Sequence, residues 1–410
     1  MKVLINGGGI GGPALATLLL RSNPHHDILI VERSPSLRDG GQQIDLRAQG
    51  ISIMRKLGLL EPIKAVCVAE SGMAFMDSAG RQKAVFGVNN SGKGQQGFTS
   101  EYEIMRGDFV HVLYEARGKG VRYEFGKYAQ GIEQEGDGVT VTFSDGKTEK
   151  FDMVVGADGQ GSRTRRMLFG AKAGEAAFHP LGPYYAFYSI PREKTDDATA
   201  RIYHIPGSRI AFLRSGNRRV TQAILAFMGD DLELEESMKK GVDAQKETWL
   251  RIFNDVESFD KERMLRGLKE TDDFYVTKIG QVKMDSWSKG RVVLLGDAGY
   301  CPSAVTGMGT TAALTGSYVL AGELARHGSD VEAALKGYDR VMRPFVQEWQ
   351  KLMPGFPRLA HMQTAWGIRV LHIVMALIAW LGIDRLLNQL LPENKGGLVV
   401  PEYPELKLDS

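Results

Sequence analysis

The spacing of hydrophobic and polar residues changes several times along the chain, and each change predicts a different kind of element. An apolar run at residues 3–5 precedes a glycine-rich loop, the segment PALATLLLRS with helical spacing, and a second apolar run, DILIVE. We therefore expect a strand, a helix and a second strand. Because such a helix connects parallel strands, the pattern predicts an α/β sheet covered by helices.

Later segments alternate between apolar and polar residues. The runs VRYEF, GVTVTFSDG and KFDMVVGADG, within residues 121–156, predict hairpins and a returning strand. Residues 184–227 contain further alternating runs joined by Pro-Gly and Gly-Asn turns. They predict an antiparallel sheet beside the first domain.

An unusually apolar segment, RVLHIVMALIAWLGIDRLLNQLL, lies towards the C-terminus at residues 369–391. Charged residues bound its apolar part, and spanning a bilayer requires roughly 20 apolar residues, so the segment is too short to cross comfortably. We interpret it as a helix that caps the substrate region or forms an oligomer contact. Peripheral membrane contact is the less favoured alternative.

Composition narrows the class of protein. The 410 residues are 43% hydrophobic and 24% charged, which suits one large domain or two interleaved domains. The formal net charge is +2 with dispersed basic residues, so we expect no nucleic-acid partner. Two distant cysteines, and a first strand that begins at the N-terminus, indicate an intracellular, cytoplasmic protein. No closely spaced Cys/His set supports a metal site.

The first glycine loop predicts a dinucleotide site. In INGGGIGG, Gly7, Gly9 and Gly12 match GxGxxG between a strand and a helix. They permit, in order, a tight turn, close approach to a pyrophosphate, and close packing of the helix on the strand. The N-terminus of the helix adds N–H donors and positive potential.

Glu32 ends the second strand, where an acid accepts hydrogen bonds from an adenosine ribose. Such an acid disfavours a 2′-phosphate, so we expect the bound adenine to belong to FAD or NAD. Arg33 leaves two further interpretations open, contact with a phosphate and stacking on adenine.

A second glycine-and-acid segment is VVGADGQGSRTR at residues 154–165. Asp158 follows a strand and suits either a turn or a ligand contact, and Ser162 suits the cap of a following helix.

The third segment, GDAGYCPSAVTGMGTT, follows the apolar run RVVLL. Asp297 suits the binding of sugar-like hydroxyls, while Gly307 and Gly309 let backbone N–H groups approach a flat polar ring. A helix that starts near Thr310 directs its positive end at that ring. Such a site fits a reduced flavin, which carries negative charge on its pyrimidine ring.

These three motifs, in this order and spacing, resemble those of the FAD-dependent aromatic hydroxylases, the class A flavoprotein monooxygenases that include tetracycline-inactivating enzymes. The resemblance covers roughly the first 350 residues. It implies an α/β fold in which an FAD-binding Rossmann-like domain of the para-hydroxybenzoate hydroxylase type is interleaved with an antiparallel-sheet substrate domain, followed by a C-terminal helical tail. The expected boundaries are FAD-binding 1–72, substrate sheet 73–100, FAD-binding 101–176, substrate domain 177–286, FAD-binding 287–352 and C-terminal helical segment 353–410.

The resemblance also implies roles for individual residues. Asp297 holds the ribityl chain, and residues 307–309, with Met308 at their centre, lie beside the isoalloxazine ring. Asp158 matches an aspartate linked to both FAD and NAD(P)H. Arg106 matches an arginine near the flavin, and a cation before a helix is disfavoured unless an anion accompanies it.

The loop LRDGGQQIDL supplies three more of these implied contacts. Arg38 matches a position that contacts NAD(P)H, Asp45 matches one that contacts FAD, and Gln43 faces the flavin. Two positions depart from the family pattern, since Tyr300 replaces a common histidine and Thr310-Thr311 replace an asparagine.

The implied reaction is reduction of FAD by NADPH or NADH, capture of O2 as a C4a-hydroperoxide, and transfer of one oxygen atom to an electron-rich small molecule. The substrate class is expected to be aromatic or polyketide-like, and the protein a monomer or homodimer. The alternative is an FAD-binding oxidoreductase or redox sensor without oxygenase turnover. A flavin halogenase is disfavoured, because none of the five tryptophans forms the WxWxIP motif.

Substrate contacts are expected from the second sheet. The candidates are Tyr185, Phe187, Tyr203, Phe212 and Arg214. Aromatic residues at period two also suit a hydrophobic core, so each has that second interpretation.

Overall fold

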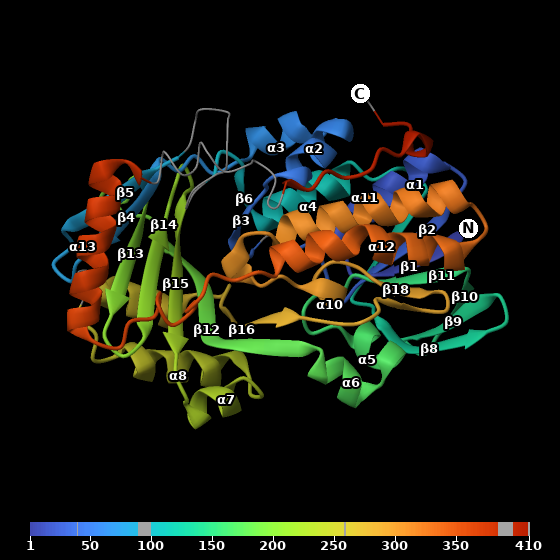
Figure 1. Ribbon diagram of the computed structural model, residues 1–410. Helices are drawn as coiled ribbons and strands as arrows, with labels where there is room; N and C mark the ends of the chain where they lie inside the picture. The colour runs from blue at the N-terminus through green and yellow to red at the C-terminus, as the bar shows by residue number, and fades with distance from the viewer. Residues whose placement is uncertain (39, 89–99, 258–259, 384–396, 409–410) are drawn as a thin grey trace.

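The computed structural model describes residues 1–38, 40–88, 100–257, 260–383 and 397–408. Within these ranges the chain forms two packed parts, one around a mainly parallel sheet and one around a larger antiparallel-rich sheet (Figure 1). No helix in the described ranges has the length and apolar character needed to cross a bilayer.

The first sheet has six strands in the order β17-β18-β11-β1-β2-β7. Its strands are β1 (Lys2–Asn6), β2 (Asp27–Glu32), β7 (Val121–Phe125), β11 (Met153–Gly156), β17 (Ser288–Lys289) and β18 (Val292–Leu294). Only the β17/β18 pair is antiparallel among these neighbours. Val3 and Ile5 enter one core and Leu4 enters another, so β1 is buried on both faces, as is typical of a parallel sheet.

Helices cover one face of this sheet, and a small sheet covers the other (Figure 1). The helical layer consists of α1 (Gly11–Ser22), α4 (Arg106–Glu115), α11 (Gly309–His327) and α12 (Val331–Trp349). The opposite layer consists of β8 (Ala129–Glu135), β9 (Gly138–Phe143), β10 (Thr148–Phe151), α5 (Arg163–Phe169) and α6 (Ala171–Ala176). Near the C-terminus, the hydroxyl of Tyr403 donates to the buried carboxylate of Glu323 on α11 at 2.7 Å, which fixes the end of the chain on the helical layer.

The second large sheet has seven strands in the order β16-β12-β15-β14-β13-β4-β5. They are β4 (Gly72–Met76), β5 (Gln82–Gly87), β12 (Phe178–Pro191), β13 (Thr199–Ile205), β14 (Arg209–Arg214), β15 (Val220–Met228) and β16 (Tyr275–Val282). One face packs on α7 (Leu232–Ser237), α8 (Val242–Phe253) and α9 (Lys261–Glu270). The far end of the other face packs on α13 (Ala365–Leu381).

The remaining elements are short. They are β3 (Gln43–Asp45), paired antiparallel with β6 (Glu103–Met105), together with α2 (Gln49–Lys56), α3 (Leu60–Ala65), α10 (Asp297–Tyr300) and the 3-10 turns η1 (Ala304–Thr306) and η3 (Pro404–Leu406).

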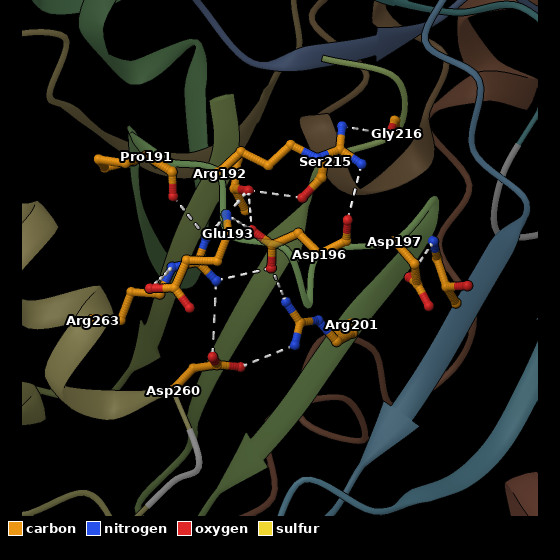
Figure 2. Close-up of polar contacts among 12 residues, drawn as sticks. Pro191, Arg192, Glu193, Asp196, Asp197, Arg201, Ser215, Gly216, Asp260 and Arg263 are labelled. Carbon is orange, nitrogen blue, oxygen red and sulfur yellow. Dashed lines mark hydrogen bonds and ion pairs between the residues drawn. The ribbon is translucent and has the colours of Figure 1, made fainter. Parts of the chain in front are cut away.

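A buried ion cluster joins α9 to the antiparallel sheet (Figure 2). Asp196 accepts hydrogen bonds from Arg201 and Arg263, and from the Thr221 hydroxyl at 2.7 Å. Asp260 lies 3.4 Å from Arg201 and 3.9 Å from Arg263 and adds a second carboxylate. Two cations and two carboxylates therefore neutralise one another inside the fold.

The predicted fold class is confirmed: a Rossmann-like parallel sheet is interleaved with an antiparallel sheet and followed by a C-terminal helix. One detail differs, because VRYEF forms β7, a parallel edge strand beside β2, rather than part of a hairpin. Alternation alone does not reveal whether a strand pairs with its neighbour in sequence or with a distant strand. The described part of the predicted apolar tail is helical as α13, whereas residues 384–391 of that segment, and residues 89–99 of the predicted substrate sheet, lie outside the described residues.

Candidate functional site

The three sequence motifs meet at one edge of the parallel sheet. Since β1, β2, β11 and β18 run in the same direction, the residues that follow them lie at the same edge, where open α/β sheets bind ligands. These residues are Gly7 after β1, Glu32 at the end of β2, Asp158 after β11 and Asp297 after β18.

The first glycine loop has the geometry that its spacing predicts. Gly7 has a φ of +129°, and a Cβ there would lie 2.3 Å from the carbonyl oxygen of Ala157. A Cβ on Gly12 would lie 2.2 Å from the carbonyl oxygen of Gly7. No side chain caps the start of α1. Its first N–H groups therefore stay available to an anion.

Glu32 borders this loop. Its carboxylate accepts hydrogen bonds from the N–H groups of Gly8 and Ser34, both at 2.9 Å. Arg38 is exposed, with its guanidinium 3.8 Å from the same carboxylate, and the neighbouring Arg33 is also exposed. The loop thus holds the acid next to the glycines, with two cations at the solvent side.

Asp297 lies in the same crevice with an unsatisfied oxygen. Its Oδ1 is buried and has no hydrogen-bond partner among the described residues. Burial raises the pKa of this carboxyl, against the opposing effects of the Cys301 thiol and the positive charge of Arg106. A Cβ on Gly309 would lie 3.9 Å from that oxygen, and no side chain caps α11, which starts at Gly309. A ligand hydroxyl at Oδ1 would satisfy the carboxylate.

Arg106 is the cation of the crevice. It is the first residue of α4, and its Nη2 lies 3.4 Å from the position of a Cβ on Gly9. Burial and the charge of Arg38 lower the pKa of Arg106, while Tyr275, Glu32 and Asp297 oppose this. Within the described residues its guanidinium makes no ion pair. A partly buried cation at a helix start without a partner indicates a place for an anionic ligand.

The end of β3, with the residues that follow it, supplies the other side of the crevice. A Cβ on Gly307 would lie 3.5 Å from Oδ2 of Asp45 and 3.7 Å from Nε of Arg47. Asp45 accepts hydrogen bonds from Arg47 at 3.0 Å and from the Ser100 hydroxyl at 2.9 Å. Sequence reasoning missed Arg47, although its position two residues after Asp45 was a usable signal.

Gln43 and Asp158, which were expected to contact the cofactors, both have side chains that hydrogen-bond to other residues of the protein. The Gln43 amide donates to Glu103, and its backbone N–H donates to Gln222 at 2.9 Å. Asp158 accepts hydrogen bonds from the Ser162 hydroxyl at 2.5 Å, from the N–H groups of Arg163 and Thr164 at 2.8 and 2.9 Å, and from the Thr164 hydroxyl at 3.1 Å. Its carboxylate therefore holds the turn that leads into α5, which is the turn interpretation of this residue. Ser162 caps the helix, as its position predicted.

The aromatic candidates divide between the two faces of the antiparallel sheet. Tyr185 and Phe212 pack with the core beneath α13, whereas Tyr203 lies in the core beneath α8 and donates its hydroxyl to Asp260 at 2.7 Å. Phe187 shares the Tyr185 face and stacks on Tyr275, with ring centroids 4.8 Å apart. Tyr203 is therefore not brought together with the others.

Tyr275 connects this aromatic face to the crevice. Its hydroxyl donates to the side chain of Gln42, and the backbone carbonyl oxygen of Gln42 accepts the backbone N–H of Arg106 at 3.1 Å. Tyr275 was not among the sequence candidates, because its strand follows a helical segment and carries no distinctive motif. Its place beside Phe187 brings the aromatic face next to the Gln42–Arg106 side of the crevice.

Arg214 anchors the border of this site rather than offering a free charge. It donates to both oxygens of Glu70, at 2.9 and 2.7 Å, and also to Glu103. A cavity of about 650 Å³ lies beside it, with Gly41, Gln43 and Gln222 in its wall. Arg214 thus neutralises two buried carboxylates at the wall of a cavity.

The two departures from the family pattern have local explanations. The hydroxyls of the buried Tyr300 and Tyr338 lie 2.7 Å apart, so Tyr300 belongs to the packing between α10 and α12. Thr311 donates its hydroxyl to the carbonyl oxygen of Arg47 at 2.8 Å and joins α11 to the Asp45 loop. Met308, just before α11, is buried in the main core.

Comparisons with known proteins identify the family of the chain. Residues 1–352 match the model of the FAD binding domain family. The chain is 42% identical to the FAD-dependent monooxygenase asL6 of Sarocladium schorii, with all of both chains covered, and 34% identical to monooxygenase CTB7 of Cercospora beticola, with 94% of each covered. The crystal structure of tetracycline destructase Tet(55) superimposes with a TM-score of 0.78 at 28% identity, covering 98% of each chain. The chain therefore belongs to the FAD-binding domain family and, within it, to the class A flavoprotein monooxygenases.

Proposed function

We propose that the protein uses NADPH or NADH and O2 to transfer one oxygen atom to an electron-rich small molecule, with aromatic or polyketide-like compounds as the substrate class. The observation that carries the proposal is the continuity of the crevice, through Arg106, Gln42 and Tyr275, with the aromatic face at Phe187. Such continuity would bring a flat apolar molecule next to a bound flavin.

The crevice residues fit FAD along its length. Gly7, Gly9 and the start of α1 would bind the pyrophosphate, and Glu32 the adenosine ribose. Asp297, with its unsatisfied oxygen, would accept hydrogen bonds from ribityl hydroxyls. The start of α11, with residues 307–309, would face the pyrimidine ring, and Asp45 and Arg47 would border it.

The cofactor would supply the redox chemistry, accepting electrons from the nicotinamide and activating O2. The protein's part is to orient the substrate and to exclude water, because water at the reacting atoms favours unproductive loss of reducing equivalents. The aromatic pair of the buried Phe187 and the half-buried Tyr275 supports both roles, since it offers a flat apolar surface with one hydroxyl directed at Gln42. Arg38, exposed at the rim, is a candidate contact for the docking nicotinamide nucleotide.

Turnover tests the proposal directly. Purified protein with FAD is mixed with NADPH or NADH, O2 and a panel of phenols, aromatic polyketides and tetracyclines. We expect at least one compound to accelerate NAD(P)H oxidation and to gain one oxygen atom by mass. Phe187→Ala should lower kcat/KM for that compound by about tenfold or more through lost apolar contact, whereas Tyr184→Phe, on the opposite face of β12, should change it little. Bound flavin without compound-stimulated oxidation would favour the redox-sensor alternative.

Asp297→Asn tests how the crevice holds FAD. We expect FAD affinity to fall by roughly 10- to 100-fold, since hydrogen bonds to a charged acceptor contribute about 1.5–3 kcal/mol. The FAD-free variant should be at least as stable as the wild type. Burial raises the pKa of Asp297, so its contribution to stability is complete below the unfolded pKa and is lost as pH rises through the folded value.

The two effects are measured by FAD titration of protein fluorescence and by thermal unfolding of the FAD-free protein. The exposed Asp285→Asn is the matched control and should leave both unchanged. Unchanged FAD affinity in Asp297→Asn would contradict the assigned role of this carboxylate.

A further inference from the structure

The outer face of α13 is an exposed apolar strip. Seven large apolar side chains of the helix are exposed to solvent: Trp366, Val370, Ile373, Val374, Leu377, Trp380 and Leu381. The two tryptophans are the most exposed, at 73% and 80%. Met353 and Leu359, in the segment that leads to the helix, are exposed as well. Contiguous exposed apolar surface of this kind marks an interaction site.

The helical geometry gathers these side chains into one stripe. At about 100° per residue, the seven positions fall within an arc of roughly 120°, and Trp366 and Trp380 lie on the same side about 21 Å apart along the axis. The opposite side of α13 packs against β5 and β13 through Met375, Ala376, Ile378 and Ala379. Because the sheet holds that side, the helix can present only the stripe to a partner (Figure 1).

We propose that this stripe docks on the surface of an anionic lipid bilayer, with α13 lying parallel to the membrane plane. Tryptophan suits the boundary between headgroups and acyl chains, and here one lies near each end of the stripe with aliphatic side chains between them. The stripe would enter the apolar region while the sheet behind it stays in the headgroup layer or in water.

The charges around the stripe favour lipid over a second copy of the chain. α13 contains one cation, Arg369, which is exposed, and no carboxylate. Lys83 on the neighbouring strand β5 and Arg81, just before it, share the single carboxylate of Asp77, which leaves a net positive charge. A two-fold contact between two such helices would bring cations together with no acid on either helix to pair them. Anionic headgroups supply that pairing.

The tryptophan distribution gives this proposal a direct optical test. Trp249, Trp287 and Trp349 are at most 1% exposed, so a change in emission on docking reports on Trp366 and Trp380. Full-length protein is mixed with vesicles of phosphatidylcholine and phosphatidylglycerol, and emission and cosedimentation are recorded. We expect emission to shift to shorter wavelength and the protein to sediment with the vesicles.

The double variant Trp366→Ser/Trp380→Ser should reduce vesicle binding at least tenfold while FAD retention stays unchanged. Leu232→Ser is the matched control, because Leu232 is 80% exposed on α7, away from the stripe, and should bind vesicles like the wild type. Absence of sedimentation with these vesicles would overturn the proposal. So would an emission shift that grows with protein concentration without lipid and accompanies a doubled mass in light scattering, since the occupant would then be a second copy.

Discussion

Gly12→Ala is expected to destabilise the protein by about 3 kcal/mol or more and to abolish FAD retention. The added Cβ would lie 2.2 Å from the carbonyl oxygen of Gly7 and 3.1 Å from Cγ2 of Ile5. Neither neighbour can yield cheaply, because the first is backbone and the second is a fully buried side chain. α1 would have to move away from β1, taking the N–H groups at its start out of line with the pyrophosphate. Denaturant unfolding and FAD absorbance after gel filtration measure the two effects.

Variants at two other glycines distinguish an effect on packing from an effect on cofactor binding. A Cβ on Gly161 meets nothing within 4 Å, so Gly161→Ala should change stability by about 0.5 kcal/mol or less and leave FAD bound. A Cβ on Gly9 meets only the flexible tip of Arg106 at 3.4 Å. Gly9→Ala should therefore fold normally and still lose FAD affinity, because the methyl group stands where the pyrophosphate approaches. A stable Gly12→Ala protein that retains FAD would refute this account of the turn.

The convergence of the motifs at the crevice that we propose binds FAD was largely predictable, because its determinants are local. A glycine with positive φ, an acid at a strand end and an uncapped helix start are each set by a few consecutive residues. The rule that the carboxyl ends of parallel strands share one edge then brings Gly7, Glu32 and Asp297 together without knowledge of side-chain packing.

The substrate side was less predictable because it depends on contacts between distant segments. Alternation showed that Phe187 and Tyr203 occupy sheet faces but not which face meets the crevice, and only the packing of α8 places Tyr203 on the other side. Tyr275 and Arg47 are recognised only from contacts between distant segments. Tyr275 contacts Gln42, and Arg47 lies beside the turn at Gly307. The same limit explains β7, whose partner β2 lies far away in sequence.

Asp196→Asn is expected to cost about 3–5 kcal/mol of stability, because removing one partner from a buried ion cluster leaves cations without compensation. Arg201 and Arg263 would then share Asp260, and Arg263 would keep a second pairing with the half-exposed Glu193 at 3.5 Å (Figure 2). Asp255→Asn is the matched control. Asp255 pairs with Arg209 but is 73% exposed, so its loss should cost about 1 kcal/mol or less.

The pH dependence of the stability lost in Asp196→Asn shows whether the charge of Asp196 causes that loss. Burial by itself would raise the pKa of Asp196, but hydrogen bonds from Arg263, Glu193 and Thr221, with the charge of Arg263, outweigh it and hold the pKa well below the usual 3.8. A depressed pKa gives stability that is present above the unfolded value and is lost as pH falls through the folded one. The difference in unfolding free energy between wild type and Asp196→Asn should thus stay constant from neutral pH to about pH 5 and shrink below about pH 4. Denaturant unfolding across this range measures it, and a difference that remained constant down to pH 2 would show that Asp196 acts through packing rather than charge.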